Sequence, residues 1–309
     1  MPNCSDCEDL PEPLPDRASL YISTPLDHTT GTLIEIFQEE DLEFLRRDDE
    51  EILEVKLSDG DYESLAKRLD ENLGSEERQQ TRCVLLKQDR EPSLRDFTNM
   101  SPLNRLIGRF QGTWLVDLLR ERKFTSYFHP IVKANDPGRV YGYEALLRGK
   151  GPGDSVIAPN KIFPTAEKMN LLFNLDREAR IFAIEEAAQH GIDERIFINF
   201  NPASIYDPAY CLRTTFEAIE EYGIDPDKIV FEVVESEEVH NRAELVGILD
   251  HYRENGFNVA LDDVGEGYSS LGMLNQLKPD FLKIDMGLVQ GISEDSFKAS
   301  ITQNLIDLA

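Results

Sequence analysis

Polar residues stand near the carboxyl ends of several apolar, strand-like segments in the second half of the chain. Side chains alternate along a strand, so Glu144 and Arg148 share a face, as do Lys283 and Asp285. The whole set is Glu144, Arg148, Asn199, Asn201, Glu232, Glu235, Asp262, Asp263, Lys283 and Asp285. In an α/β barrel the active site lies at the carboxyl ends of the strands. The pattern therefore predicts one polar site built from several strands.

The residue types in this set indicate a site for hard cations. Carboxylates and an amide oxygen suit Mg²⁺ or Mn²⁺, whereas zinc favours histidine and cysteine. Carboxylates at such density repel one another unless cations lie among them, and Arg148 and Lys283 leave negative charge in excess. A cation there would hold a phosphate and lower the pKa of water. Metal-assisted hydrolysis of a phosphodiester is the predicted chemistry.

The elements that must position these residues alternate between strand and helix after Phe124. The strand candidates are rich in valine, isoleucine and aromatic residues, and they read SYFHPIV, VYGYEALLR, RIFINFN, KIVFEVVE, FNVALDDV and DFLKIDM. Between most of them lie helical stretches such as DREARIFAIEEAAQH and RAELVGILDHYREN. This alternation predicts an α/β fold with a parallel sheet, either closed as a barrel or open and doubly wound.

Ordered motif blocks make the prediction specific. The segment YGYEALLRG follows FHPIV, and it is followed by INFNP, FEVVES, LDDVGEGYSSLGML and LKPDFLKIDM. In this order, across residues 124–309, the chain resembles the EAL-domain family of cyclic-di-GMP phosphodiesterases. The resemblance implies a TIM-like barrel that hydrolyses cyclic di-GMP to linear pGpG with two divalent cations, Mg²⁺ or Mn²⁺. It also implies a bacterial signalling protein that forms a homodimer.

The resemblance assigns roles to individual positions. It implies metal ligands at Glu144, Asn199, Glu232 and Asp262, with Asp262 bridging, and a ligand of the second metal at Asp263. Lys283 would orient or activate the attacking water, so Glu144, Asp263 and Lys283 are the predicted catalytic residues.

The resemblance also implies substrate contacts. Arg148 would contact a phosphate of the ligand, and Asp285 would lie near a guanine. His129 stands where the family often has glutamine, and its ring can hydrogen-bond a base. Glu235 would brace the loop Val264–Ser270.

Family members continue beyond the last residues of this sequence into strands that carry a further metal-ligand glutamate. The EAL segment is therefore expected to lack its last strands. Two alternatives to the phosphodiesterase follow: a receptor that binds cyclic di-GMP without cutting it, and an inactive fragment. An unrelated Mg²⁺-dependent barrel enzyme acting on an enolisable acid is a remote third.

The first 123 residues differ from the rest in composition and in hydrophobic pattern. Residues 1–16 carry Pro11, Pro13 and Pro15 among acids and predict a disordered tail, in which Cys4 and Cys7 are interpreted as free thiols rather than a zinc site. Residues 17–100 predict a small α/β module with a regulatory role. Residues 101–123 carry an apolar stripe at helical spacing, which predicts a connecting helix or, alternatively, a partner interface.

Composition narrows the classes of partner. The net charge is −27, from 59 acidic and 32 basic residues, and such a surface repels nucleic-acid polymers. The sequence has no apolar run long enough to span a bilayer, and its first residues are acidic rather than basic. We therefore expect a cytoplasmic protein that binds neither membranes nor nucleic acids.

Overall fold

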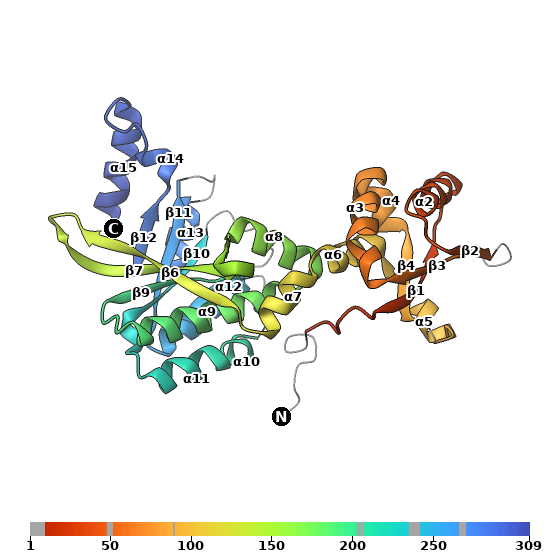
Figure 1. The fold of residues 1–309 in the computed structure, drawn as a ribbon. Helices are drawn as coiled ribbons and strands as arrows, with labels where there is room; N and C mark the ends of the chain where they lie inside the picture. The colour runs from red at the N-terminus through yellow and green to blue at the C-terminus, as the bar shows by residue number, and fades with distance from the viewer. Residues whose placement is uncertain are drawn as a thin grey trace. The chain divides into compact units, whose positions relative to one another are not determined.

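The computed structural model describes residues 10–47, 52–88, 90–202, 205, 207–234, 242–265 and 270–309. The chain divides into two compact units (Figure 1). The first comprises Met1–Glu121 with Asn160–Leu171, and the second comprises Arg122–Pro159 with Leu172–Ala309. Cys4 and Cys7 lie outside the described residues, as does most of the tail predicted before residue 17. Among the described residues, no helix has both the length and the apolar character needed to cross a bilayer.

The first unit contains an antiparallel five-stranded sheet in the order β2-β3-β1-β4-β5. Its strands are β1 (Arg17–Ser23), β2 (Phe44–Arg47), β3 (Ile52–Ser58), β4 (Arg82–Lys87) and β5 (Ser101–Pro102). Its helices are α2 (Asp27–Glu39), η1 (Asp59–Asp61), α3 (Tyr62–Asn72), α4 (Ser75–Gln80), α5 (Leu94–Thr98), α6 (Leu103–Gln111), α7 (Thr113–Arg120) and α8 (Pro159–Met169).

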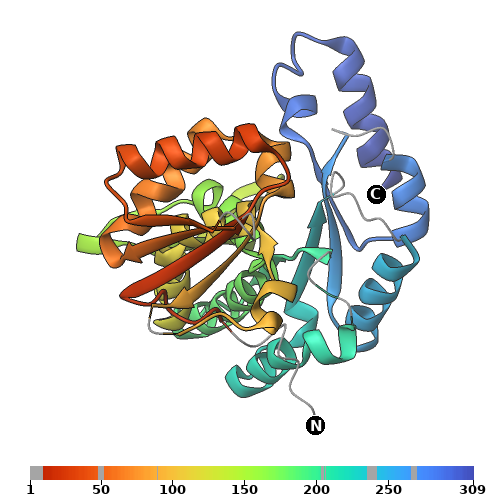
Figure 2. The ribbon, with the colours of Figure 1, turned by 90° about the vertical axis from the view of Figure 1, so that its right-hand side faces the viewer.

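Alternation along β1 separates the two faces of this sheet. Leu20 and Ile22 are fully buried in the main core of the unit, together with residues of α2 and α3. Tyr21 points to the opposite face, where its ring meets Phe97 of α5 edge to face at 6.1 Å. Figure 2 shows α2 and α5 on opposite sides of the strands. The small α/β module is thus a sheet with helices on both faces.

Residues 101–123, predicted as one connecting helix, form α6 and α7 with Gly112 between them. A Cβ atom at Gly112 would collide with Met169 of α8, and one at Gly108 would lie 3.0 Å from the Lys168 carbonyl oxygen. Helix α8 therefore packs against this helix pair at backbone distance. Although α8 lies within the segment predicted for the barrel, it belongs to the first compact unit.

The second unit contains a seven-stranded sheet in the order β12-β11-β10-β9-β7-β6, with β8 beside β7. Its strands are β6 (Phe124–Lys133), β7 (Asp136–Lys150), β8 (Val156–Ile157), β9 (Arg195–Asn199), β10 (Ile229–Val234), β11 (Asn258–Val264) and β12 (Phe281–Ile284). All six predicted strands are present. The predicted parallel pairing holds from β7 through β9, β10, β11 and β12, but it is wrong for β6, which runs antiparallel to β7. Two residues separate them, too few for the crossover that a parallel pair requires.

Helices cover one face of this sheet. They are α9 (Leu172–Gln189), α10 (Pro208–Cys211), α11 (Arg213–Tyr222), η4 (Pro226–Lys228), α12 (Arg242–Glu254), α13 (Ser270–Leu277), α14 (Met286–Val289) and α15 (Ser296–Leu308). On β10, Phe231 and Val233 enter the core under the helices, whereas Val230 lies in a smaller cluster with Phe197 and Ala260 on the other face. The result is an α/β half-barrel (Figures 1 and 2).

Candidate functional site

The predicted site residues share the face of the sheet that carries the smaller apolar cluster. Glu232 and Asp262 follow Val230 and Ala260 by two residues, so alternation places each on the same side as its neighbour in that cluster. Glu144 pairs directly with Phe197 in the register of β7 and β9. Adjacent parallel strands therefore bring these side chains to a common edge. The prediction that several strands build one polar site is consistent with this arrangement.

Three carboxylates meet around one ammonium group. One oxygen of each of Glu144, Glu232 and Asp262 lies within 4.8 Å of the others. Lys283 Nζ lies 2.8 Å from Asp262 Oδ2, 3.0 Å from Glu232 Oε1 and 3.3 Å from Glu144 Oε1. We call Glu144, Glu232, Asp262 and Lys283 the carboxylate centre. It carries more negative than positive charge, and the ammonium offsets only part of the repulsion among the acids.

Glu232 is the buried member of the carboxylate centre. Its side chain is 0% exposed, whereas Glu144 and Asp262 are 19% and 15% exposed. Burial raises the pKa of Glu232 to about 8, and the charges of Glu144 and Asp262 add to the rise while Lys283 opposes it. Burial alone would lower the pKa of Lys283, but the three acids outweigh it and raise that pKa.

A bulge in β11 separates the two neighbouring aspartates. The register with β12 shifts between Leu261 and Val264, and Asp263 adopts a positive φ of 53°. Such a backbone is unusual for a non-glycine residue. The Asp263 N–H donates to Asp262 Oδ1 at 2.9 Å, which holds the Asp262 carboxylate at the bulge. Asp263 is not a member of the close carboxylate group, so its role at a second metal stays a prediction.

Asn199 and its neighbours connect the carboxylate centre to a buried ion pair. The amide of Asn199 donates to Glu144 Oε1 at 3.3 Å. Two residues further, the Asn201 N–H donates to Asp176 Oδ1 at 2.9 Å, and the other oxygen of Asp176 pairs with Arg180. Arg180 is fully buried and also donates from Nε to Thr215 at 3.1 Å. This pair anchors the chain where β9 ends.

Sequence reasoning missed the part played by Asp176 and Arg180. The signal was present: two opposite charges stand four residues apart in one helix, a spacing that places them on one face. Burial of that face is a property of the folded chain.

The residues predicted to contact the substrate have different surroundings in the structure. His129 is exposed and directly opposite Glu144 in the register of β6 and β7. The Arg148 guanidinium lies over the ring of Tyr127, 5.2 Å from its centroid, and donates to the Leu147 carbonyl. Asp285 caps α14 by accepting the Gly287 N–H at 2.8 Å. Glu235 and most of the loop that it was predicted to brace lie outside the described residues.

The carboxylate centre has the donor chemistry of a divalent-cation site. All its potential ligand atoms are oxygens, which Mg²⁺ and Mn²⁺ prefer. Glu232 Oε1 is buried and, although Lys283 is close, receives no hydrogen bond of acceptable geometry within the described structure. A buried carboxylate oxygen in that state favours a cation as its partner. The residues present therefore fit a metal.

An α/β half-barrel with oxygen ligands at the carboxyl ends of its strands defines a class of barrel proteins with a candidate cation site at the rim. The EAL domain family matches residues 113–309, and the chain belongs to that family. The predicted resemblance and the EAL-type TIM-like fold are confirmed by this match and by the structures below.

Two curated relatives come from Escherichia coli K12. Cyclic di-GMP phosphodiesterase PdeF is 30% identical over 179 residues, covering 56% of this chain and 23% of PdeF. Probable cyclic di-GMP phosphodiesterase PdeG is 32% identical over 192 residues, covering 59% of this chain and 36% of PdeG. The chain thus spans about a quarter to a third of the length of these relatives.

Two solved structures are similar to the second part of this chain in both sequence and fold. A standalone EAL protein from Vibrio cholerae O395, bound to c-di-GMP, is 34% identical with a TM-score of 0.53, covering 60% of this chain and 76% of the other. The PaMucR phosphodiesterase, in complex with c-di-GMP, is 28% identical with a TM-score of 0.54, covering 63% and 81%.

Proposed function

We propose that this protein hydrolyses cyclic di-GMP to linear pGpG with divalent cations bound at the carboxylate centre. The observation that carries the proposal is the convergence of Glu144, Glu232 and Asp262 around Lys283. The relatives' names and the c-di-GMP in the neighbouring structures supply the substrate. That the protein acts as a homodimer in the bacterial cytoplasm remains a prediction from the sequence.

Glu144, Glu232, Asp262 and Asn199 would hold the first cation, and Asp263 the second. A bound cation polarises the phosphate and lowers the pKa of water. Attack of water on phosphorus breaks the bond to a ribose 3′ oxygen, which leaves as the alcohol. Without a cation, the three acids raise the pKa of Lys283, and its ammonium donates hydrogen bonds to Glu232 and Asp262; beside a bound phosphate the same side chain would orient the attacking water. Arg148 would hold a phosphate oxygen.

The experiment is chromatography of cyclic di-GMP incubated with the protein and Mg²⁺ or Mn²⁺. We expect linear pGpG from the wild type and at least about a 100-fold loss of rate in Glu144→Gln, because a Lewis-acid contribution of several kcal/mol depends on the ligands. Glu194→Gln, an exposed acid in the loop before β9, is the matched control and should retain the wild-type rate. Wild-type protein that binds c-di-GMP yet releases no pGpG would refute hydrolysis.

The alternative proposal is a receptor that binds cyclic di-GMP without cutting it. It is favoured by one observation: Asp263, the predicted ligand of a second metal, stands outside the close carboxylate group. Isothermal titration with c-di-GMP in Ca²⁺, followed by the same chromatography in Mg²⁺, separates the two functions. Binding with turnover supports the enzyme, and binding without turnover supports the receptor.

A further inference from the structure

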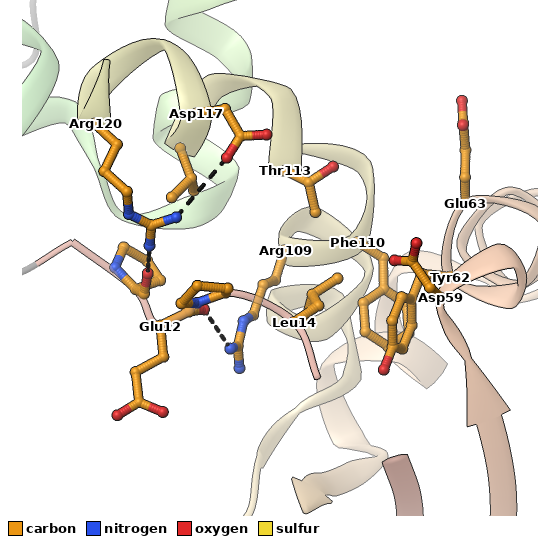
Figure 3. Close-up of a pocket in the computed structure, with 13 residues that line it drawn as sticks. Glu12, Leu14, Asp59, Tyr62, Glu63, Arg109, Phe110, Thr113, Asp117 and Arg120 are labelled. Atoms are coloured by element: carbon orange, nitrogen blue, oxygen red, sulfur yellow. Dashed lines mark hydrogen bonds and ion pairs between the residues drawn. The ribbon is translucent and has the colours of Figure 1, made fainter. Parts of the chain in front are cut away.

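A proline-bearing segment at the start of the described chain lies along a groove in the first unit. Residues 11–15 read PEPLP, and alternating prolines favour the extended polyproline II conformation, in which backbone carbonyls point outward without internal partners. With the segment in place, a cavity of about 320 Å³ remains beside it, and α3, α6, α7 and the segment itself line that cavity (Figure 3).

Side-chain donors from three helices bind three carbonyl oxygens of this segment. Arg120 Nη2 of α7 donates to Pro11 O at 2.6 Å, and Arg109 Nη2 of α6 donates to Glu12 O at 2.8 Å (Figure 3). The Tyr62 hydroxyl of α3 donates to Pro15 O at 2.5 Å. Side-chain donors beside aromatic rings are how grooves recognise polyproline ligands. Here the ring of Tyr62 packs on Phe110 with centroids 4.7 Å apart.

The guanidinium of Arg109 requires a hydrogen-bond acceptor in the groove. Arg109 is half-buried and its Nε is shielded from solvent without a hydrogen bond; burial lowers the pKa of its guanidinium, and the charge of Glu12 opposes that fall. A desolvated guanidinium without a partner is unfavourable, so the Glu12 carbonyl stabilises it in the docked state. Leu14 adds an apolar contact with the core beneath. The pattern of three carbonyl contacts and one leucine is that of a ligand in a binding site.

We propose that Tyr62, Arg109 and Arg120 form a recognition groove for an extended proline-rich segment, and that residues 11–15 of the same chain are its ligand. The groove belongs to the first unit and the carboxylate centre to the second, so the proposal is independent of the proposed function. Docking ties the N-terminal segment to α6 and α7, and three residues separate the end of α7 from the first strand of the second unit. If another proline-rich ligand displaced the segment, α6 and α7 would lose their link to the N-terminal residues.

The test uses the full-length chain and a fluorescein-labelled peptide of residues 10–16. In the wild type the tethered segment competes at high effective concentration and keeps the peptide out. Pro11→Ala/Pro13→Ala/Pro15→Ala removes the preorganisation of the tethered segment, and we expect the peptide to bind this variant at least about 10-fold more tightly, measured by fluorescence anisotropy.

Adding Arg109→Met to the triple variant should abolish peptide binding, whereas Lys67→Met, at an exposed position of α3, should leave it unchanged. Tyr62→Phe removes one donor without an apolar change, so it tests the groove even if Arg109→Met unfolds the unit. The proposal is overturned if the triple variant binds no peptide, if it binds no better than the wild type, or if Tyr62→Phe and Arg109→Met both bind normally. Wild-type dimers that dissociate on the proline substitutions would show docking between copies and overturn the assignment to one chain.

Discussion

Replacing Lys283 by methionine should make the protein bind divalent cations more tightly. The ammonium lies 2.8–3.3 Å from the three carboxylates that form the candidate cation site. A cation and the ammonium therefore compete for the same oxygens. Unit charges 4 Å apart interact by about 4 kcal/mol at an effective dielectric constant of about 20. Relief of only a third of one such repulsion, about 1.4 kcal/mol, lowers the Kd tenfold.

The same change should weaken the protein when no cation is present. Removing one partner from a largely buried ion pair costs about 3–5 kcal/mol, because the remaining charges stay desolvated and uncompensated. Lys283 is 26% exposed and faces three acids, so we expect the cation-free variant to fall in this range. Saturating Mn²⁺ should recover most of the loss, because ligand at 100 times its Kd adds about 2.7 kcal/mol.

The assay is isothermal titration with Mn²⁺, together with urea unfolding in EDTA and in Mn²⁺. Lys228→Met is the matched control, since Lys228 pairs with the 92%-exposed Asp193. Such a surface pair contributes about 0–1 kcal/mol, so neither its stability nor its Mn²⁺ affinity should change much. If Lys283→Met binds Mn²⁺ no more tightly than the wild type, the three carboxylates do not share a cation, and the reasoning fails.

Three further outcomes are expected. Because the pKa of Glu232 is raised from 4.5 to about 8, its protonation contributes stability to the cation-free fold that is fully present below about pH 4.5 and is lost as the pH rises through about 8. Urea unfolding in EDTA should show the free energy of unfolding falling over this range, and Glu232→Gln should remove that pH dependence. Arg180→Met should lower the free energy of unfolding by about 3–5 kcal/mol, whereas pairing it with Asp176→Leu should recover part of that, and an additive double variant would contradict the buried pair. The exposed ring of Tyr127 lies beside Arg148, the predicted phosphate contact, and could stack on a base; Tyr127→Ala should therefore weaken c-di-GMP binding in Ca²⁺ by about 5- to 150-fold, while its Mn²⁺ affinity stays unchanged. The control Tyr222→Ala should bind c-di-GMP normally, and normal binding by Tyr127→Ala would contradict a role for this ring.

The sequence predicts the face of the sheet that carries the site, because strand alternation is a local property. Glu144 and Glu232 stand at positions where an apolar residue was due, and the folded sheet places both beside Lys283. The strands themselves follow from their β-branched and aromatic residues. Alternation also suggests opposite faces for Asp262 and Asp263, but a bulge in β11 interrupts that simple pattern. Bulges depend on the pairing of two strands and leave little trace in one of them.

Other features depend on contacts between distant segments and so escaped prediction. Helix α2 carries three threonines and a glycine, which weaken its local helical signal, and buried Leu33 and Phe37 hold it on the sheet instead. Residues 10–16 read as a tail because nothing in their composition reveals Arg109 or Arg120 about a hundred positions away.

Because α8 belongs to the first unit but lies within the sequence of the second, the two units cannot be separated by cleaving the chain at one position. The backbone passes between them at residues 121–122, 159–160 and 171–172. A fragment that began at Arg122 would carry α8 without the glycine-bearing helices against which it packs, leaving Thr165 and Met169 without their contact at Gly112. Excision of the N-terminal unit would therefore expose apolar surface of α8 and favour aggregation. A displacement of α6 and α7 would also move α8, whose two ends are covalently joined to the second unit.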